Sequence, residues 1–110
     1  MERFVKGDVV IIPFPFSNLE KTKKRPALII ANLEGNDYIL AQITSHLKND
    51  NYSIIISNDD FYSGNLNLLS MLRPNRLFTA EKSLFLYKIG SLKKEKIKEI
   101  QDKIIEIFTN

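Results

Sequence analysis

Short runs of β-branched and aromatic residues, each bounded by polar or proline-containing segments, dominate the first 90 residues of the chain. Such runs are typical of strands, and an uninterrupted run such as Val9–Ile12 indicates a buried one. The pattern predicts six strand segments, at Asp8–Ile12, Ala27–Ala31, Tyr38–Thr44, Asn51–Ser57, Ser70–Arg73 and Ser83–Lys88.

Prolines and polar clusters predict where the strands are interrupted. Pro13–Phe16 is expected to stop strand pairing, because proline has no N–H donor. The polar, basic segment Ser17–Lys24 is expected to be an exposed loop, and Asn32–Asp37 a turn. Asn58–Asn65 is expected to hold little regular structure, and Pro74–Thr79 to form a short helical turn.

The hydrophobic period changes after Gly90. Five apolar residues then recur at intervals that place them on one face of a helix: Ile97, Ile100, Ile104, Ile107 and Phe108. Ser91 is the candidate N-cap. The other face carries mixed charges, which we interpret as a solvated surface: Lys93, Lys94, Lys96, Glu99, Asp102 and Glu106. Short strands followed by one terminal helix predict a mostly β fold, a small antiparallel barrel with the helix packed against it.

The composition limits the kinds of site and reaction that the chain can support. A length of 110 residues with 44% hydrophobic residues predicts a single domain over 1–110. The sequence has no cysteine, which excludes disulfides and thiolate catalysis, and its single histidine, His46, excludes a two-histidine ribonuclease mechanism within one chain. Asp59 and Asp60 are interpreted as solvated turn acids, and no metal or cofactor is expected. The net charge of +3 permits an anionic partner without requiring one.

No segment of the sequence is expected to enter a membrane. The longest stretch without charged residues, Phe61–Leu72, has 12 residues, whereas a helix needs about 20 to cross a bilayer. Met1–Asp8 includes no apolar signal region, so we expect an intracellular, cytoplasmic protein.

Two segments carry candidate chemistry. Lys21–Arg25 holds four cations in five residues, and the guanidinium of Arg25 can bind two phosphate oxygens at once. The strand that ends at Thr44 is followed by Ser45 and His46, so two hydroxyls and an imidazole meet there. On residue type alone, a solvated basic loop and an ordinary strand end are the more common interpretations.

Three motifs, taken in order, resemble those of the PemK/MazF toxins. They are found at Gly7–Val10 with Pro13–Phe16 and Lys23–Ile30, at Gln42–Ser45, and at Ser70–Thr79, and the terminal helix falls where the family has one. The resemblance covers nearly the whole chain and implies an SH3-like barrel and a homodimer. It also implies the toxin of a type II toxin–antitoxin system, a sequence-selective endoribonuclease (mRNA interferase) that cuts single-stranded RNA. A cognate antitoxin would silence it by covering the RNA site with a disordered tail.

The resemblance also assigns site residues. The family's catalytic arginine, just before a proline, falls on Arg25, and its catalytic threonine falls on Thr44. Its third-motif serine and arginine, near the RNA-binding surface, correspond to Ser70 and Arg73. The full set of RNA-binding candidates is Ser17, Lys23, Lys24, Ser45, Ser70 and Arg73.

These residues suit a reaction that needs no metal. RNA can be cleaved by its own 2′-hydroxyl, which leaves a 2′,3′-cyclic phosphate and a 5′-hydroxyl. Arg25 can stabilise the charge that grows on the phosphorane, and Thr44 can position the scissile phosphate. A threonine hydroxyl is a poor general acid on its own. His46 stays outside the expected catalytic set, because the family motif has no histidine there.

Two departures from the family and two alternative functions stay open. The loop Ser17–Lys24 lacks the glycine that many members carry, and the segment after Ser70 lacks their Gln-Ile-Arg sequence, so no RNA sequence preference is predicted. One alternative is a non-enzymatic, topoisomerase-binding toxin resembling CcdB, although those relatives rely on a tryptophan that this sequence does not have. The other is a catalytically inactive relative that binds RNA or antitoxin.

Overall fold

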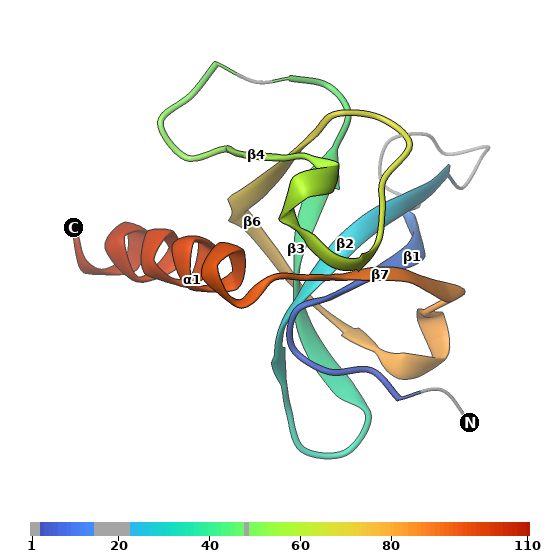
Figure 1. Ribbon diagram of the computed structural model, residues 1–110. Helices are drawn as coiled ribbons and strands as arrows, with labels where there is room; N and C mark the ends of the chain where they lie inside the picture. The colour runs from blue at the N-terminus through green and yellow to red at the C-terminus, as the bar shows by residue number, and fades with distance from the viewer. Residues whose placement is uncertain (1–2, 15–22, 48) are drawn as a thin grey trace.

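The computed structural model describes residues 3–14, 23–47 and 49–110. Within them the strands are β1 (Asp8–Phe14), β2 (Lys23–Asn32), β3 (Asp37–Thr44), β4 (Ile54–Ile56), β5 (Phe61–Gly64), β6 (Ser70–Glu81) and β7 (Tyr87–Leu92). These seven strands form an antiparallel sheet in the order β4-β6-β3-β2-β1-β7-β5. The sheet curls into a half-closed barrel, and helix α1 (Lys94–Thr109) follows β7 on one side of it (Figure 1). The predicted mostly β fold with a C-terminal helix is confirmed.

The central strands bury both of their faces, which explains their uninterrupted apolar sequence. One core joins them to the flanking strands and α1: Val9, Leu28, Ala41, Ile43, Ile54, Ile56, Phe61, Leu72, Leu92, Ile100 and Ile104. Alternate residues of these strands and of β6, together with Phe4 and Phe85 from outside the strands, form a second core on the other face: Phe4, Val10, Ile12, Ala27, Ile29, Leu40, Ala80 and Phe85. Because successive residues of a strand point to opposite faces, a strand between two cores is apolar at every position.

β1 does not end before Pro13, so the predicted end of this strand is wrong. The strand continues through Pro13, which lies opposite Lys24 of β2. Among the described residues, β1 has no register partner on β7 beyond Ile11. This part of β1 is therefore an edge, where the missing N–H of a proline removes no ladder hydrogen bond. Lys23 and Lys24, predicted as the end of a loop, lie in β2, and the rest of that loop falls outside the described residues.

The segment Pro74–Thr79 is part of β6 and forms no helical turn, which corrects the second prediction based on a proline. The register between β3 and β6 shifts between Arg73 and Leu77. The residues between them, including the buried Pro74, form a bulge and have no register partner on β3. The missing N–H of Pro74 therefore removes no hydrogen bond between these strands. Pairing with β3 on both sides of the bulge outweighs the local preference for a turn.

The turn predicted at Asn32–Asp37 is confirmed, since β2 ends and β3 begins at its two ends. The fourth predicted strand, Asn51–Ser57, is shorter than expected and covers only β4. The carboxylate of Asp50 accepts hydrogen bonds from the amides of Tyr52 at 2.9 Å and Ser53 at 2.7 Å. Those amides are therefore unavailable to a ladder.

Two predictions in the second half of the chain are wrong. Asn58–Asn65 contains a 3₁₀ turn, η1 (Asn58–Asp60), followed by β5. The strand predicted at Ser83–Lys88 begins instead at Tyr87, after a second 3₁₀ turn, η2 (Lys82–Leu84). Both segments are short, and cross-strand partners rather than composition decide whether such segments pair.

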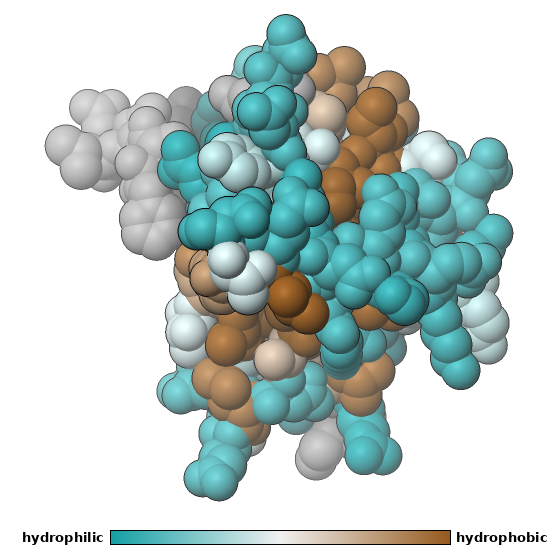
Figure 2. Space-filling view, turned by 90° about the vertical axis from the view of Figure 1, so that its left-hand side faces the viewer, coloured by the Kyte–Doolittle hydropathy of each residue, from teal (hydrophilic) through white to brown (hydrophobic). Residues whose placement is uncertain are grey.

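Helix α1 begins later than predicted. Its N-cap is Lys93, whereas Ser91 lies in β7 and donates its hydroxyl to the buried carboxylate of Asp8 at 2.7 Å. Ile100 and Ile104 are buried against the sheet, as the apolar stripe predicted, whereas Phe108, the last residue of that stripe, is exposed beyond the part of α1 that packs on the sheet. The surface on the side of the C-terminal end of α1 is mostly hydrophilic, with smaller hydrophobic areas (Figure 2). In the described part of the chain, no helix is both long and apolar enough to span a membrane.

Candidate functional site

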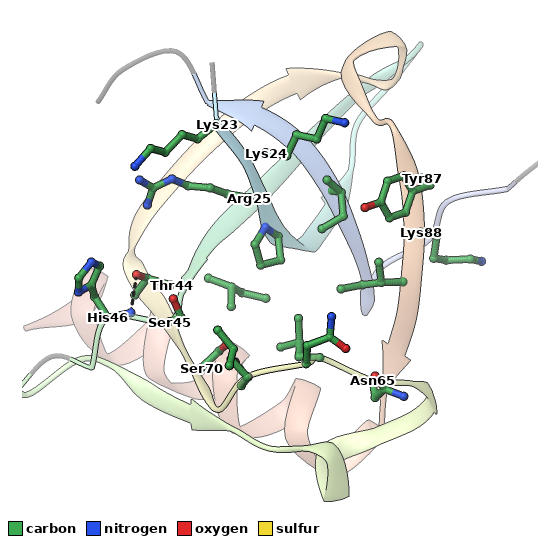
Figure 3. Close-up of a pocket in the computed structure, with 17 residues that line it drawn as sticks. Lys23, Lys24, Arg25, Thr44, Ser45, His46, Asn65, Ser70, Tyr87 and Lys88 are labelled. Atoms are coloured by element: carbon green, nitrogen blue, oxygen red, sulfur yellow. Dashed lines mark hydrogen bonds between the residues drawn. The ribbon is translucent and has the colours of Figure 1, made fainter. Parts of the chain in front are cut away.

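A groove with a volume of about 790 Å³ crosses four neighbouring strands, β3, β2, β1 and β7 (Figure 3). Each of these strands contributes one apolar residue to the lining: Ile43, Pro26, Ile11 and Ile89. The loop between β5 and β6 contributes Asn65–Leu68. The remaining lining residues carry charge, a hydroxyl or an imidazole: Lys23, Lys24, Arg25, Thr44, Ser45, His46, Ser70, Tyr87 and Lys88.

Arg25 is held in the groove by its strand. It lies on β2 opposite Ile12 and is half-buried. Pro26 favours an extended backbone at Arg25, and strand alternation puts Lys23 on the same face of β2. Figure 3 shows the two side chains extending in the same direction, with their cationic groups at the same end of the groove. An anion at this end would meet both cations.

Thr44 is the last residue of β3 and lies at the same end of the groove as Arg25 (Figure 3). Its hydroxyl oxygen accepts a hydrogen bond from the backbone amide of His46 at 3.1 Å. A hydroxyl that accepts in this way keeps its hydrogen to donate. Ser45 and His46 are exposed and line the groove beside it. The structure thus brings Arg25, Lys23, Thr44 and Ser45 together, whereas Lys24 lines the groove but extends in the other direction (Figure 3).

Ser70 lines the groove from a buried position at the start of β6. Its hydroxyl donates a hydrogen bond to the carbonyl oxygen of Leu68 at 2.9 Å. The side chain therefore holds the end of the β5–β6 loop.

Arg73 is not among the residues that line the groove. Its guanidinium lies 3.6 Å from the carboxylate of Asp50, and its side chain is only 15% exposed. In the described part of the chain, Nε of Arg73 is buried without a hydrogen-bond partner. The amides of Ser53 and Tyr52 hold the pKa of Asp50 below its ordinary value, and desolvation opposes them with a smaller effect. The Ser53 hydroxyl and Arg73 lower the same pKa by still smaller amounts. Arg73 thus ties β6 to the loop that follows Thr44.

The groove also contains residues that the sequence did not single out, namely Tyr87, Lys88, Asn65 and Asn67. No motif marks them, and only the pairing of β7 with β1 brings Tyr87 to the groove. Lys88 lies 3.5 Å from the carboxylate of Asp8, so its charge is partly compensated. Ser17 and Lys21, predicted near the site, lie outside the described residues.

The adjacent acids Asp59 and Asp60 belong to η1 and do not line the groove. Asp60 accepts a hydrogen bond from the amide of Ser57 at 2.8 Å and lies 3.7 Å from Lys96, so it caps the turn and pairs with α1. Over residues 3–14, 23–47 and 49–110, no three His, Asp or Glu side chains form a group that could hold a metal ion.

Three solved structures share the fold over nearly the whole chain. An endoribonuclease from a mycobacterial species, in complex with its cognate antitoxin, superposes with a TM-score of 0.77 at 13% identity, over 96% of this chain and 95% of that one. A second mycobacterial endoribonuclease gives 0.73 at 14% identity, over 98% and 93% of the two chains. The Mycobacterium tuberculosis toxin MazF-mt6 gives 0.72 at 18% identity, over 92% and 95%.

A comparison with curated proteins finds no match. Residues 5–108, however, match the family described as the PemK-like, MazF-like toxin of type II toxin–antitoxin systems. The match spans all three motifs and the terminal helix, and the superposed structures have the same arrangement of sheet and helix. This chain therefore belongs to the PemK-like, MazF-like family of toxins of type II toxin–antitoxin systems.

Proposed function

We propose that this toxin is an endoribonuclease that cleaves single-stranded RNA, including mRNA, without a metal ion. The observation that carries the proposal is the placement of Arg25 and Thr44 at one end of one groove, beside the cations of β2. The family match and the endoribonuclease names of two of the superposed structures support the same class of reaction. An RNA substrate of this kind would place its action in the cytoplasm.

The proposed reaction uses the 2′-hydroxyl of the RNA as the nucleophile. A bond forms between the 2′-oxygen and phosphorus, and the bond from phosphorus to the 5′-oxygen breaks. The proton lost by the 2′-hydroxyl is balanced by the proton that the 5′-oxygen gains, so the products are a 2′,3′-cyclic phosphate and a 5′-hydroxyl. The protein must align the attacking and leaving oxygens and stabilise negative charge on the phosphorane.

Arg25 suits the stabilisation of that charge. Its guanidinium is permanently charged, and its planar fork matches two phosphate oxygens. Thr44 suits positioning, because the His46 amide engages its oxygen and its hydrogen can be donated to the phosphate. We assign Thr44 to positioning first and to proton transfer second, since a threonine hydroxyl is weakly acidic.

The other candidates divide by their place in the structure. Lys23, Lys24 and Ser45 are exposed lining residues, and we assign them to contacts with the RNA backbone. Ser70 acts through the loop that it holds, and Arg73 through Asp50.

Two partners complete the proposal. One superposed endoribonuclease is in complex with its cognate antitoxin, which supports an antitoxin partner for this chain. We propose that a cognate antitoxin silences this toxin by laying a disordered tail over the groove. A cationic groove suits an acidic segment of such a tail. We further propose that the toxin acts as a homodimer.

The test is incubation of the pure protein with a long unstructured RNA in excess EDTA. We expect discrete cleavage that survives chelation, with 5′-hydroxyl ends on the products. Cleavage that EDTA abolishes and Mg²⁺ restores, with 5′-phosphate ends, would contradict the 2′-hydroxyl mechanism. Intact RNA together with inhibited DNA supercoiling would favour the topoisomerase-binding alternative. RNA binding with neither cleavage nor inhibited supercoiling would favour a catalytically inactive relative.

A further inference from the structure

The groove is larger than the proposed reaction centre requires. Its volume of about 790 Å³ falls within the range, roughly 300–1,000 Å³, of sites that enclose a drug-sized molecule. Arg25 and Thr44 occupy one end, on β2 and β3. The other end lies on β7, and neighbouring strands are about 4.8 Å apart, so β3 and β7 are separated by about 14 Å along the sheet.

Tyr87 dominates the β7 end. The residue is 50% exposed, and its hydroxyl points toward the groove (Figure 3). Among the described residues this hydroxyl has no hydrogen-bond partner, so it is available to a ligand in the groove. A half-exposed aromatic ring in a hollow is the kind of platform on which single-stranded nucleic acids stack their bases.

The β5–β6 loop, which lines the same groove across from Tyr87 (Figure 3), offers hydrogen-bonding groups. Asn65 and Asn67 are exposed and line the groove, and each amide group has both donors and an acceptor. The amide of Leu66, between them, donates to the side-chain oxygen of Asn58 at 3.1 Å. This bond anchors the loop to η1, so the two side chains start from a fixed backbone.

The two ends of the groove differ in how their cations are arranged. Lys88, the cation next to Tyr87, lies 3.5 Å from the buried carboxylate of Asp8. Of the cations on β2, Lys23 and Arg25 extend to the opposite end of the groove, whereas Lys24 extends toward the β7 side (Figure 3). Two cations therefore lie together at the Arg25 end, where they can bind a phosphate, whereas the β7 end offers an aromatic ring and amide groups.

We propose that Tyr87, Asn65 and Asn67 form a nucleobase-binding subsite for single-stranded RNA. Tyr87 stacks on one base, and the two amides hydrogen-bond to its edge. The β3 and β7 ends of the groove are about 14 Å apart, whereas successive phosphates of a stacked strand are about 3.4 Å apart along the axis. The base at Tyr87 therefore belongs to a different nucleotide from the scissile one. A base inside a duplex cannot stack on Tyr87, which gives selectivity for unpaired RNA. The inference rests on the proposed function.

The experiment compares Tyr87→Ala with Tyr87→Phe, which keeps the ring, and with Tyr62→Ala as a matched control. Tyr62 is 80% exposed on β5 and does not line the groove. Cut sites are mapped on a long unstructured RNA. Binding is then measured with a fully 2′-O-methylated copy of a mapped site, which cannot be cut by its own 2′-hydroxyl. Tyr87→Leu provides a second ringless variant if the alanine variant fails to fold.

Base stacking contributes about 1–3 kcal/mol per base, so Tyr87→Ala and Tyr87→Leu should weaken binding by roughly 5- to 150-fold. They should also lose the base preference at one position away from the cut. Tyr87→Phe and Tyr62→Ala should bind like the parent. The salt dependence of binding should stay unchanged in Tyr87→Ala, because no phosphate contact is lost, whereas Lys23→Ala should lower its slope by up to about one.

RNA binding as tight as the parent's in Tyr87→Ala and Tyr87→Leu, or a reduced salt slope in Tyr87→Ala, would contradict the proposed subsite. Neither result would contradict the proposed nuclease activity. Unchanged RNA binding with an altered sedimentation coefficient would assign Tyr87 to a protein interface instead. If the parent protein cuts no RNA, the unmodified RNA itself becomes the binding probe. Ring-dependent binding would then support the subsite even though the proposed nuclease had failed.

Discussion

Arg25 is the only described arginine that lines the groove, and it supplies the charge that the proposed reaction needs. Arg25→Ala removes an interaction that strengthens as charge develops on the phosphorane. We expect a loss of about 10²–10³ in rate, with kcat and kcat/KM falling together. Arg25→Lys should restore little, because an ammonium lacks the bidentate geometry. Lys98→Ala, an equal change of charge on the exposed surface of α1, should cut RNA like the parent.

Thr44 allows a sharper substitution, because valine keeps its β-branched shape. Thr44→Val should fold normally and cut RNA more slowly, whereas Thr44→Ser keeps the hydroxyl and should retain most of the rate. Single-turnover cleavage of one RNA by folded variants measures the difference. Equal rates for Thr44→Val and the parent would remove Thr44 from the site.

Asp50 makes the loop after Thr44 sensitive to acid. Its pKa is lowered in the folded protein, so its contribution to stability is present above the unfolded value, about 3.9, and is lost as pH falls through the folded value. Asp50→Asn should therefore be less stable than the parent at pH 7, and the difference should shrink toward pH 3. Urea unfolding of both proteins at the two pH values measures this. A difference that grows in acid would contradict the assigned direction.

At the scale of elements, the pairing of β5 with β7 depends on a close approach at Gly64. This residue has φ of +75°, and an added Cβ would lie 2.5 Å from Cα of Gly90. Gly35 has a similar φ of +72° but open space around it. Gly35→Ala should cost about 1–2 kcal/mol through its backbone conformation alone. Gly64→Ala should cost about 1–3 kcal/mol more, because the strands must also separate. Urea unfolding of the two variants tests this, and equal losses would show that the close approach is unimportant.

At the scale of the whole molecule, apolar side chains stay exposed beside the groove and on α1. Leu68 is 65% exposed in the β5–β6 loop, and Phe108 is 72% exposed near the end of α1. A homodimer that covers such residues should bury at least about 1,000 Å² in total. We expect sedimentation to show a dimer at micromolar concentration. Leu68→Asp should weaken it, and Leu33→Asp, at the distant β2–β3 turn, should not. A monomer at every concentration would contradict the dimer.

Local sequence was sufficient to predict most of the elements. The apolar runs of β1, β2 and β3 and the stripe on α1 are visible without a structure. A strand buried on both faces has a continuous run of apolar residues, and a helix buried on one face has apolar residues three or four positions apart. Two of the exceptions share a cause. Pro13 and Pro74 lie within strands because an edge in one case and a bulge in the other tolerate them, and no local pattern shows which strand pairs where.

The candidate site divides in the same way. Arg25 and Thr44 were predicted because each stands in a recognisable motif at a strand end. Their shared groove, the Tyr87 end opposite them and the attachment of Arg73 to Asp50 depend on which strands lie side by side. A motif records the chemistry of neighbours along the chain, whereas a groove is made by residues that the curled sheet brings together from distant positions. The sequence therefore indicated the candidate groups, and strand order decided what surrounds them.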